Sequence, residues 1–397
     1  MSEGFKTPKP DVAPSLLTHG EANLRDEARD AAARLLAPDA DGRNERGGFP
    51  NDAVDALGRM GFMGLLVPSA FGGRGCGILG YSLALEEIAA VDAGVSTTMH
   101  VHSLGATLML ARFGTEAQKA RYLPEMAAGR TIGSFVLTEP QAGSDAAAIR
   151  TVARRDGDDF VITGSKHLIT NGKTAGVVLV WALTDPALGR EGITAFIVPT
   201  DTPGYDGSHV DAKMGQHSSE TVRVELNECR VPAANILGVE GRGFRHAMSG
   251  LADGRIAIAA QAVGIAQAAY AAALDYARSR EAYGAPIIKL QAIQFRLADM
   301  ATQIEIARNF YISTAAQRQA GHDCIREASM AKLFASEMAE KVCSDALQIF
   351  GGNGYLREYR VERYCRDVRV TQIYEGTSDI QRLIIGRDIA RSPLSGE

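Results

Sequence analysis

The spacing of hydrophobic and polar residues changes twice along this chain of 397 residues. After a proline-bearing start, apolar positions recur at the spacing of amphipathic helices, as in Glu21–Leu36. Short β-branched runs then take over, and a helical pattern returns near Gly241. We therefore expect a mostly helical α+β protein with four regions: a tail at 1–20, a helical domain at 21–131, a β domain at 132–238 and a helical domain at 239–397.

The middle region carries patterns that are typical of strands. Thr151–Arg155 and Phe160–Thr163 flank Asp156–Asp159, which predicts a hairpin. Val177–Leu183 is a continuous β-branched and apolar run, and Thr221–Leu226 alternates apolar with polar residues. These patterns predict a small antiparallel domain, built as a barrel or a sandwich.

The last region contains four stretches with helical periodicity. They are Ile256–Arg278, Gln291–Arg318, Glu327–Phe350 and Ser378–Ala390. Four helical stretches in succession predict an up-down four-helix bundle.

The overall composition narrows the classes of function. Apolar residues make up 46% and charged residues 22%, with a net charge of −5, so the chain has no basic footprint for nucleic acid or an anionic membrane. The five cysteines form no CxxC pair and are interpreted as buried or idle thiols in a reducing compartment. We see no apolar run long enough for a membrane span, no secretory signal and no histidine spacing for a metal, and we expect a cytoplasmic protein without metal.

The candidate catalytic residue is Glu375, in the stretch Gln372–Ser378. An apolar and aromatic neighbour, Tyr374, precedes this carboxylate, and Gly376 follows it. Desolvation makes a carboxylate hold its proton more tightly, which would suit it to removing a weakly acidic C–H proton. On the stretch alone, a solvated surface glutamate is the alternative interpretation.

Two loops could bind a phosphate or a polar heterocycle. In Leu137–Asp145, Pro140 and Gly143 predict a turn whose backbone N–H groups are exposed, although an ordinary interdomain loop has the same features. Gln348–Tyr355 holds three glycines in four positions, which allow a ligand to approach the backbone closely but also suit the end of a helix. Arg280 follows a long helix, where it could contact a pyrophosphate or compensate the helix dipole.

In combination, these segments resemble the flavin-dependent acyl-CoA dehydrogenase family, over about residues 21–391. Gln348–Asp367 matches one family signature at every defined position, and Leu137–Asp145 matches a second one apart from Val136, which replaces a smaller residue. The resemblance implies a helical domain, a β domain and a four-helix bundle, with non-covalent FAD between the β domain and the bundle. It also implies a homotetramer or homodimer in which two subunits build each FAD site.

The resemblance also assigns roles to residues of this chain. For the flavin end of FAD it implies contacts from Phe135, Leu137, Thr138, Gly143, Ser144, Leu168, Ile169 and Thr170, with Thr377 and Asp379 beside them. For the adenine and pyrophosphate of a neighbouring subunit's FAD it implies Arg280, Tyr283, Gln291, Gln348, Gly351 and Gly352. For the acyl-CoA substrate it implies Ser144, Arg255, Tyr374 and Gly376. Leu168 stands where many members have an aromatic residue, and Ala252 where many have an Asp.

The implied reaction is α,β-dehydrogenation of an acyl-CoA to the trans-2-enoyl-CoA, as in fatty acid β-oxidation. Glu375 would take the α-proton while the β-hydrogen leaves as hydride to flavin N5, and an electron-transferring flavoprotein would receive the electrons. Some members place the base immediately before the arginine of the Gly254–Arg255 pair, where this chain has a glycine. The alternatives are a flavin-dependent oxidase or monooxygenase on the same fold, and a non-catalytic relative that binds nucleic acid.

Overall fold

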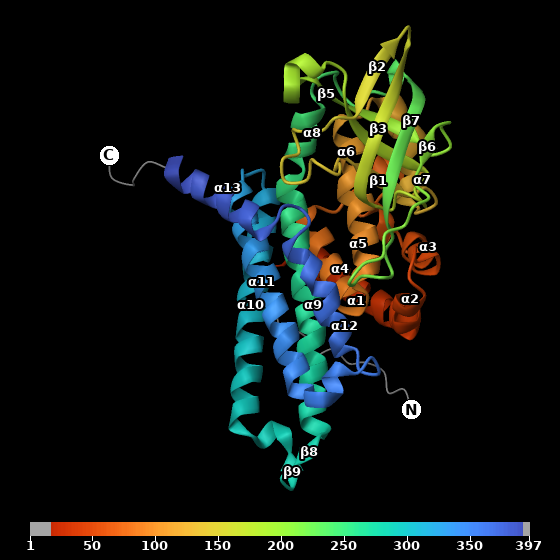
Figure 1. The fold of residues 1–397 in the computed structure, drawn as a ribbon. Coiled ribbons are helices and arrows are strands. Elements are labelled where there is room, and N and C mark those ends of the chain that lie inside the picture. Colours follow the sequence, from red (N-terminus) through yellow and green to blue (C-terminus); the bar gives the residue numbers. More distant parts are fainter. Residues whose placement is uncertain (1–16, 392–397) are drawn as a thin grey trace.

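The N-terminal part of the molecule is a layer of helices (Figure 1). The computed structural model describes residues 17–391, so most of the predicted tail lies outside the described residues. Thr18 and Glu21 form a capping box at the first helix, and Thr115 and Gln118 form another at the last. The helices are α1 (His19–Ala31), α2 (Ala40–Arg46), α3 (Asn51–Arg59), α4 (Ile78–Val91), α5 (Ala93–His100), α6 (Leu108–Phe113) and α7 (Glu116–Ala127), with π-helical segments at Ala32–Leu36 and Val101–Thr107.

The β domain is one curled sheet of seven strands. The strands are β1 (Gly133–Val136), β2 (Val152–Asp156), β3 (Asp159–Thr170), β4 (Val177–Leu183), β5 (Ile193–Pro199), β6 (Tyr205–Asp206) and β7 (Thr221–Pro232). Their order is β1-β4-β2-β3-β7-β6, and β5 also pairs with β4. The predicted hairpin is confirmed, with Asp156 opposite Asp159. The expectation of a purely antiparallel sheet was wrong in one respect, because β1 and β2 both pair with β4 in parallel.

Strand β4 is buried on both faces, which explains its uninterrupted apolar sequence. Val178 and Val180 point into the interior of the curled sheet, with Phe196 and Val222. Leu179 belongs to the other face, which packs against the helical residues Met109 and Leu110. One strand therefore joins the core of the β domain to the N-terminal helices.

The C-terminal part is helical, as predicted, and its helices are not equivalent. They are α8 (Gly243–Ser249), α9 (Leu251–Ser279), α10 (Gln291–Gln319), α11 (Ile325–Phe350), α12 (Val361–Val368) and α13 (Ser378–Arg391), with a two-stranded turn of β8 (Glu281–Ala282) and β9 (Ala285–Pro286) after α9. Helices α9, α10 and α11 run side by side, whereas α13 leaves the others at an angle (Figure 1). Helix α4 of the N-terminal part packs against α9 and α10, so α9 is surrounded and its many alanines allow close approach.

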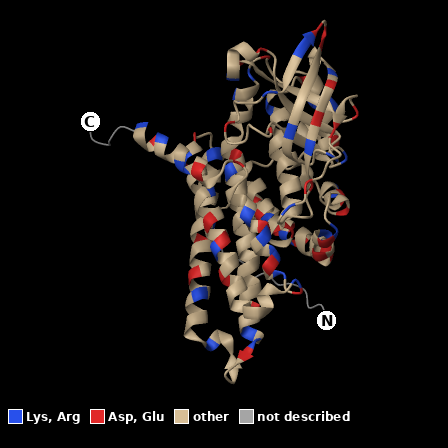
Figure 2. Ribbon diagram, in the orientation of Figure 1, with Lys and Arg blue, Asp and Glu red and all other residues tan. Residues whose placement is uncertain are grey.

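The stretch Gly243–Ser279 is long and apolar enough to cross a membrane by length and composition, which the sequence analysis did not anticipate. However, 83% of its most apolar window is buried inside the fold, as in a core helix. Figure 2 shows Lys and Arg interspersed with Asp and Glu on the helices and on the strands. The cysteines are free thiols, and Cys229, Cys324 and Cys343 are buried, in agreement with the prediction.

Candidate active site

Glu375 lies in a short turn between Gln372 and α13 whose backbone is held from two sides. Glu375 has a φ of 54° and Gly376 a φ of 87°, so two successive residues occupy the left-handed region. The Nζ of Lys332, on α11, donates to the carbonyl oxygen of Gly376 at 2.8 Å. The Nε2 of Gln381 donates to the same oxygen at 2.9 Å and to that of Glu375 at 3.1 Å. These hydrogen bonds compensate the strain of the left-handed backbone at Glu375. Strained backbone of this kind clusters at functional sites.

The carboxylate of Glu375 is enclosed by two helices. His100, at the end of α5, lies with its Nε2 3.3 Å from Oε1. On α9, a Cβ placed on Gly254 would lie 2.7 Å from Oε2, so the absence of a side chain there provides the space that the carboxylate occupies. The Glu375 side chain is 30% exposed, whereas the His100 side chain is only 4% exposed. The carboxylate thus faces an opening that a ligand can enter.

The pKa of Glu375 is lowered, so the raised pKa predicted from the sequence was wrong. Desolvation alone would raise the pKa of Glu375, as the sequence analysis expected. The hydrogen bond to His100 and the charges of His100, Arg255 and Lys332 act in the opposite direction, and the net result is a lowered pKa. The carboxylate is therefore held ionised, in the form that can take a proton, by neighbours on three helices, α5, α9 and α11.

A buried polar network anchors the residue before the base. The Tyr374 hydroxyl donates to Gln261 Oε1 and accepts from Gln216 Nε2. Gln261 in turn donates to Ser96 at 2.7 Å and to Thr97 at 2.8 Å, both on α5. Burial raises the pKa of Tyr374 to about 12, so its hydroxyl keeps its proton and acts as a hydrogen-bonding anchor.

The predicted loop Leu137–Ser144 is fixed by a buried ion pair. The Nζ of Lys166 donates to Glu139 Oε1 at 2.8 Å, to the Leu137 carbonyl oxygen at 3.1 Å and to the Trp181 carbonyl oxygen at 2.7 Å. Desolvation opposes the charge on both partners, but Lys166 and the hydrogen bonds lower the pKa of Glu139 to about 2. Gly143 and Ser144, farther along the loop, remain exposed. The structure thus presents this loop rigidly to solvent.

The curl of the sheet brings the two predicted flavin-contacting segments of the β domain together. The Thr138 carbonyl oxygen accepts from the His167 backbone N–H at 2.9 Å, and Ser134 Oγ donates to the Thr170 carbonyl oxygen at 2.6 Å. A register shift between Lys166 and Ile169 gives Leu168 a φ of 59° and leaves its side chain 59% exposed. The backbones of the two segments therefore meet in one patch, in which the Leu168 side chain is exposed while those of Leu137 and Ile169 are buried in separate cores.

Helix α5 connects this patch to the carboxylate. Asn171, immediately after β3, donates through Nδ2 to the Thr98 carbonyl oxygen at 3.0 Å. Two residues further along the same helix, His100 reaches Glu375. Thr377 and Asp379 follow Glu375 closely, with the Asp379 side chain exposed. Arg255 is buried beside the carboxylate and donates to Ser329 at 3.3 Å, and its contact with CoA stays a prediction.

The remaining predicted FAD-binding residues lie at the other end of the bundle. The exposed residues Arg280, Tyr283 and Gln291 surround the β8–β9 turn (Figure 1), and Gln348, Gly351 and Gly352 lie at the end of α11. At a rise of about 1.5 Å per residue, the helix from Arg255 to Arg280 spans roughly 38 Å. That is farther than one FAD molecule extends, so the structure separates the predicted residues into two groups.

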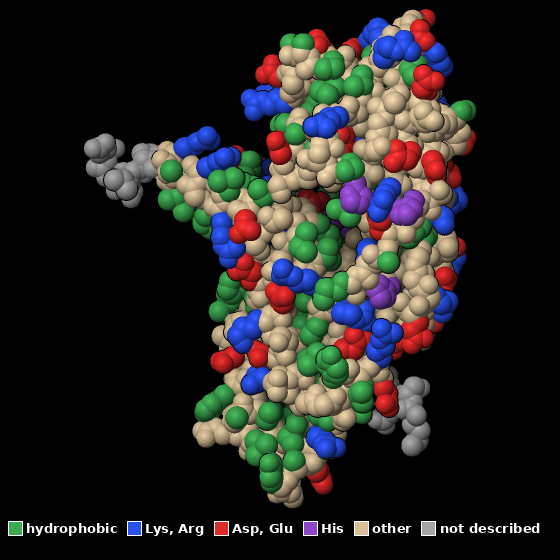
Figure 3. All heavy atoms as spheres, viewed as in Figure 1, with side chains coloured by type: hydrophobic (Ala, Val, Ile, Leu, Met, Phe, Trp, Pro, Cys, Tyr) green, Lys and Arg blue, Asp and Glu red, His purple; other side chains and the backbone are tan. Residues whose placement is uncertain are grey.

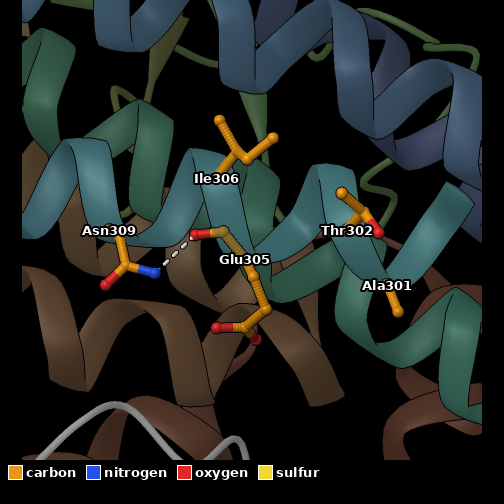
Figure 4. A pocket seen from close by; sticks show the side chains of 5 residues that line it. All are labelled: Ala301, Thr302, Glu305, Ile306 and Asn309. Atoms are coloured by element: carbon orange, nitrogen blue, oxygen red, sulfur yellow. Dashed lines mark hydrogen bonds between the residues drawn. The ribbon is translucent and has the colours of Figure 1, made fainter. Parts of the chain in front are cut away.

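The space-filling view shows a hollow between the β domain and the helices, with acidic atoms inside it (Figure 3). A different recess, of about 660 Å³, lies on α10 and is lined by Ala301, Thr302, Glu305, Ile306 and Asn309 (Figure 4). Its lining residues all come from one helix and include no predicted site residue. The candidate active site around Glu375 is therefore not this recess.

Sequence reasoning missed two residues of the site. The sequence analysis did not single out His100, because nothing in its neighbourhood along the chain indicated a contact with Glu375. Lys332 did carry a signal, because it falls four residues after Ala328 and four before Ser336, on the buried face of α11. A lysine on such a face needs a partner, which here is the Gly376 carbonyl oxygen.

Comparison with known proteins assigns the three domains of this chain to one family. Family models for the N-terminal, middle and C-terminal domains of acyl-CoA dehydrogenases match residues 18–130, 134–229 and 241–390. An acyl-CoA dehydrogenase of Bacillus subtilis (strain 168) is 45% identical over 94% of this chain and 98% of its own length. The mitochondrial short-chain specific acyl-CoA dehydrogenase of Bos taurus is 43% identical over 93% of this chain and 90% of its own length.

Solved structures give the same result. Butyryl-CoA dehydrogenase from Megasphaera elsdenii has a TM-score of 0.92 at 41% identity, covering 94% of this chain and 99% of that one. A chain in the structure of the electron transferring flavoprotein of Acidaminococcus fermentans has a TM-score of 0.93 at 43% identity, covering 95% and 99%. Glutaryl-CoA dehydrogenase from Mycobacterium smegmatis, in complex with FADH2, has a TM-score of 0.91 at 31% identity, covering 97% and 98%. This chain, an oxidoreductase by these relationships, belongs to the acyl-CoA dehydrogenase family.

Proposed function

We propose that the protein dehydrogenates a short acyl-CoA to the trans-2-enoyl-CoA, with Glu375 as the base that removes the α-proton. The observation that carries the proposal is the partly exposed carboxylate of Glu375, enclosed between His100 and Gly254. An α-proton next to a thioester is weakly acidic, and a positioned carboxylate at hydrogen-bonding distance is the group such a reaction needs. The similarity to short-chain and butyryl-CoA dehydrogenases supports a short acyl group.

The residues present fit a flavin cofactor. The patch around Leu168 combines an exposed apolar side chain in a left-handed conformation with the open backbone at Gly143, where an added Cβ would meet no atom within 4 Å. A flat aromatic ring system can lie on such a surface, and backbone N–H groups can bind its polar edge. When bound there, FAD would supply the acceptor for the β-hydrogen, which leaves as hydride.

The second group of predicted residues supports a cofactor site shared between subunits. Arg280 and Gln348 lie too far from Glu375 for one FAD to reach both ends of the bundle within one chain. Gly351 and Gly352 also leave open space beside their backbone. We therefore propose a homo-oligomer, a homotetramer rather than a homodimer, in which these residues bind the adenine end of a neighbouring subunit's FAD. We also propose that an electron-transferring flavoprotein is the electron acceptor.

The test is anaerobic stopped-flow reduction of the flavin by butyryl-CoA and longer acyl-CoAs. Purified protein should be yellow and release FAD on denaturation. Glu375→Gln preserves the shape of the side chain but removes its basicity, so FAD should stay bound while reduction slows by at least about 10²–10⁴-fold. Glu116→Gln, on an exposed side chain of α7, is the matched control and should reduce at the wild-type rate.

Reduction of Glu375→Gln within about tenfold of the wild-type rate would assign the base to another residue. Rapid reoxidation of the reduced protein by air would instead favour the oxidase alternative.

A further inference from the structure

His100 lies at a change in helix type, directly against the proposed base. It is the last residue of α5, and the π-helical segment Val101–Thr107 begins immediately after it. The wider π turn changes the direction in which side chains leave the helix, and such turns occur frequently at functional sites. Through this junction the buried imidazole of His100 reaches a residue 275 positions away in the sequence.

The surroundings of the imidazole determine which nitrogen carries the proton. Nδ1 of His100 has no hydrogen-bond partner among residues 17–391, whereas Nε2 faces Oε1 of Glu375 at 3.3 Å. If Nε2 were the unprotonated nitrogen, its lone pair would point at an ionised oxygen. An ionised Glu375 therefore requires a proton on Nε2 of His100, which is donated to the carboxylate.

The other charged groups near Glu375 do not bind its carboxylate directly. Lys332, from α11, uses its Nζ for the Gly376 carbonyl oxygen. Arg255, from α9, donates to Ser329. The neutral hydroxyls of Tyr374, on the preceding residue, and of Tyr81, on α4, complete the groups that face Glu375. Within residues 17–391, the hydrogen bond that holds the carboxylate itself comes from His100.

A second histidine of the same segment provides a contrast. His102 has both nitrogens engaged, because Nδ1 accepts from the Gly133 backbone N–H at 3.0 Å and Nε2 lies 3.1 Å from the Met126 carbonyl oxygen. Burial lowers the pKa of His102 to about 4, which keeps it neutral as a link between the helices and β1. His100 has no such structural link through its side chain.

On this basis we infer that His100 is a positioning residue for the reaction proposed above, because its Nε2–H orients the carboxylate of Glu375 and stabilises its ionised form. The inference rests on the proposed function. It assigns to His100 no contact with the substrate. Its effect acts through Glu375 alone, and this makes a definite prediction about pH.

The test compares His100→Leu, which removes the donor, with His100→Gln, whose Nε2–H2 can replace the imidazole donor. FAD-loaded protein is mixed anaerobically with butyryl-CoA from acid to neutral pH. We expect the limiting rate of His100→Leu to fall about tenfold or more, with acyl-CoA affinity changed less than about threefold. Losing a hydrogen bond that favours the ionised form raises the pKa of Glu375, so the acidic limb of the rate profile should move up by about one pH unit.

His100→Gln should restore both the rate and the position of the limb to within about threefold and half a pH unit of the wild type. A second readout needs no electron transfer. Acetyl-CoA has α-protons but no β-hydrogen, so its exchange with D2O, followed by mass spectrometry, reports the base alone and should show the same ranking of variants. His322→Gln, on an exposed side chain, is the matched control and should behave as the wild type.

A folded His100→Leu holoenzyme with the wild-type rate and pH limb would overturn the inference and leave the proposed function intact. If His100→Leu does not fold, His100→Gln is compared with His100→Asn instead, because the shorter amide of asparagine cannot reach Oε1 of Glu375. Equal rates for these two variants would overturn the inference. A wild-type protein that neither reduces its flavin with any acyl-CoA nor exchanges α-protons would refute the proposed function, and the role of His100 with it.

Discussion

Replacing Gly254 by Ala should disable the active site without destabilising the protein. An added Cβ would lie 2.7 Å from Oε2, 3.0 Å from Cδ and 3.3 Å from Oε1 of Glu375. Because favourable non-bonded distances are about 3.5 Å or more, the carboxylate would have to retreat by roughly 1 Å. A misplacement of about 1 Å in a reacting group can cost about 10²-fold in rate, or about 2.7 kcal/mol of transition-state stabilisation.

The thermal stability of Gly254→Ala should rise slightly or stay unchanged, although its activity falls. Gly254 lies inside α9, and the three atoms nearest to a methyl group added at this position all belong to the end of the Glu375 side chain. Alanine favours a helix interior over glycine by about 0.5–1 kcal/mol. We therefore expect a melting temperature equal to or slightly above that of the wild type, with FAD fully bound.

The assay is the limiting rate of anaerobic flavin reduction by butyryl-CoA, measured together with thermal unfolding. Gly386→Ala is the matched control, because Gly386 also lies in a helix but its added Cβ would meet no atom within 4 Å. In a Glu375→Gln background, Gly254→Ala should cause little further loss, since there is no base left to misplace. A rate for Gly254→Ala within about threefold of the wild type, or an undiminished loss in the Glu375→Gln background, would refute this reasoning.

Three further predictions follow from individual contacts. Lys332→Met removes the bond to the Gly376 carbonyl oxygen, so the limiting rate of flavin reduction should fall by about tenfold while FAD stays bound, as stopped-flow and absorbance measurements would show. Desolvation alone would raise the pKa of Glu139, but Lys166 and hydrogen bonds lower it from 4.5 to about 2, so Glu139 should stabilise the fold above about pH 4.5 and lose this contribution as the pH falls towards 2. Urea unfolding should show a steeper loss of free energy over this window for the wild type than for Glu139→Gln. Arg280→Ala should weaken FAD retention and assembly together, at about 1.5–3 kcal/mol for a lost charged hydrogen bond, as seen by flavin absorbance across a sizing column.

Most secondary structure could be predicted because it depends on local pattern. The run Val177–Leu183 has the bounds of β4, and the predicted helix Gln291–Arg318 differs from α10 by one residue. The parallel pairing of β1 with β4 was not predictable in this way. Strand β1 has only four residues, and its partner lies about forty residues further along the chain, so nothing local specifies the direction of pairing.

The candidate site shows the same division between local and distant information. The stretch Gln372–Ser378 and the family resemblance indicate Glu375, but the environment of its carboxylate is made by side chains from α5, α9 and α11. The apolar residues next to Glu375 in the sequence predicted a raised pKa, whereas the cations that lower it come from more than forty residues away at the nearest, Lys332. The sign of a pKa shift depends on which charges the fold brings close, and sequence neighbours do not supply that information.

The structure explains why position 254 is a glycine, which the sequence alone does not. In the sequence, Gly254 only shows that the alternative location for a base is empty. In the structure, the space beside Gly254 is filled by the carboxylate of Glu375, so a side chain at position 254 and the observed position of Glu375 exclude each other. The proposed base and any side chain at position 254 would compete for one volume, so a chain that uses Glu375 as proposed needs a residue without a side chain at this point of α9. With α9 closing one side of the carboxylate and His100 the other, the exposed part of the Glu375 side chain is where a substrate can present its α-proton.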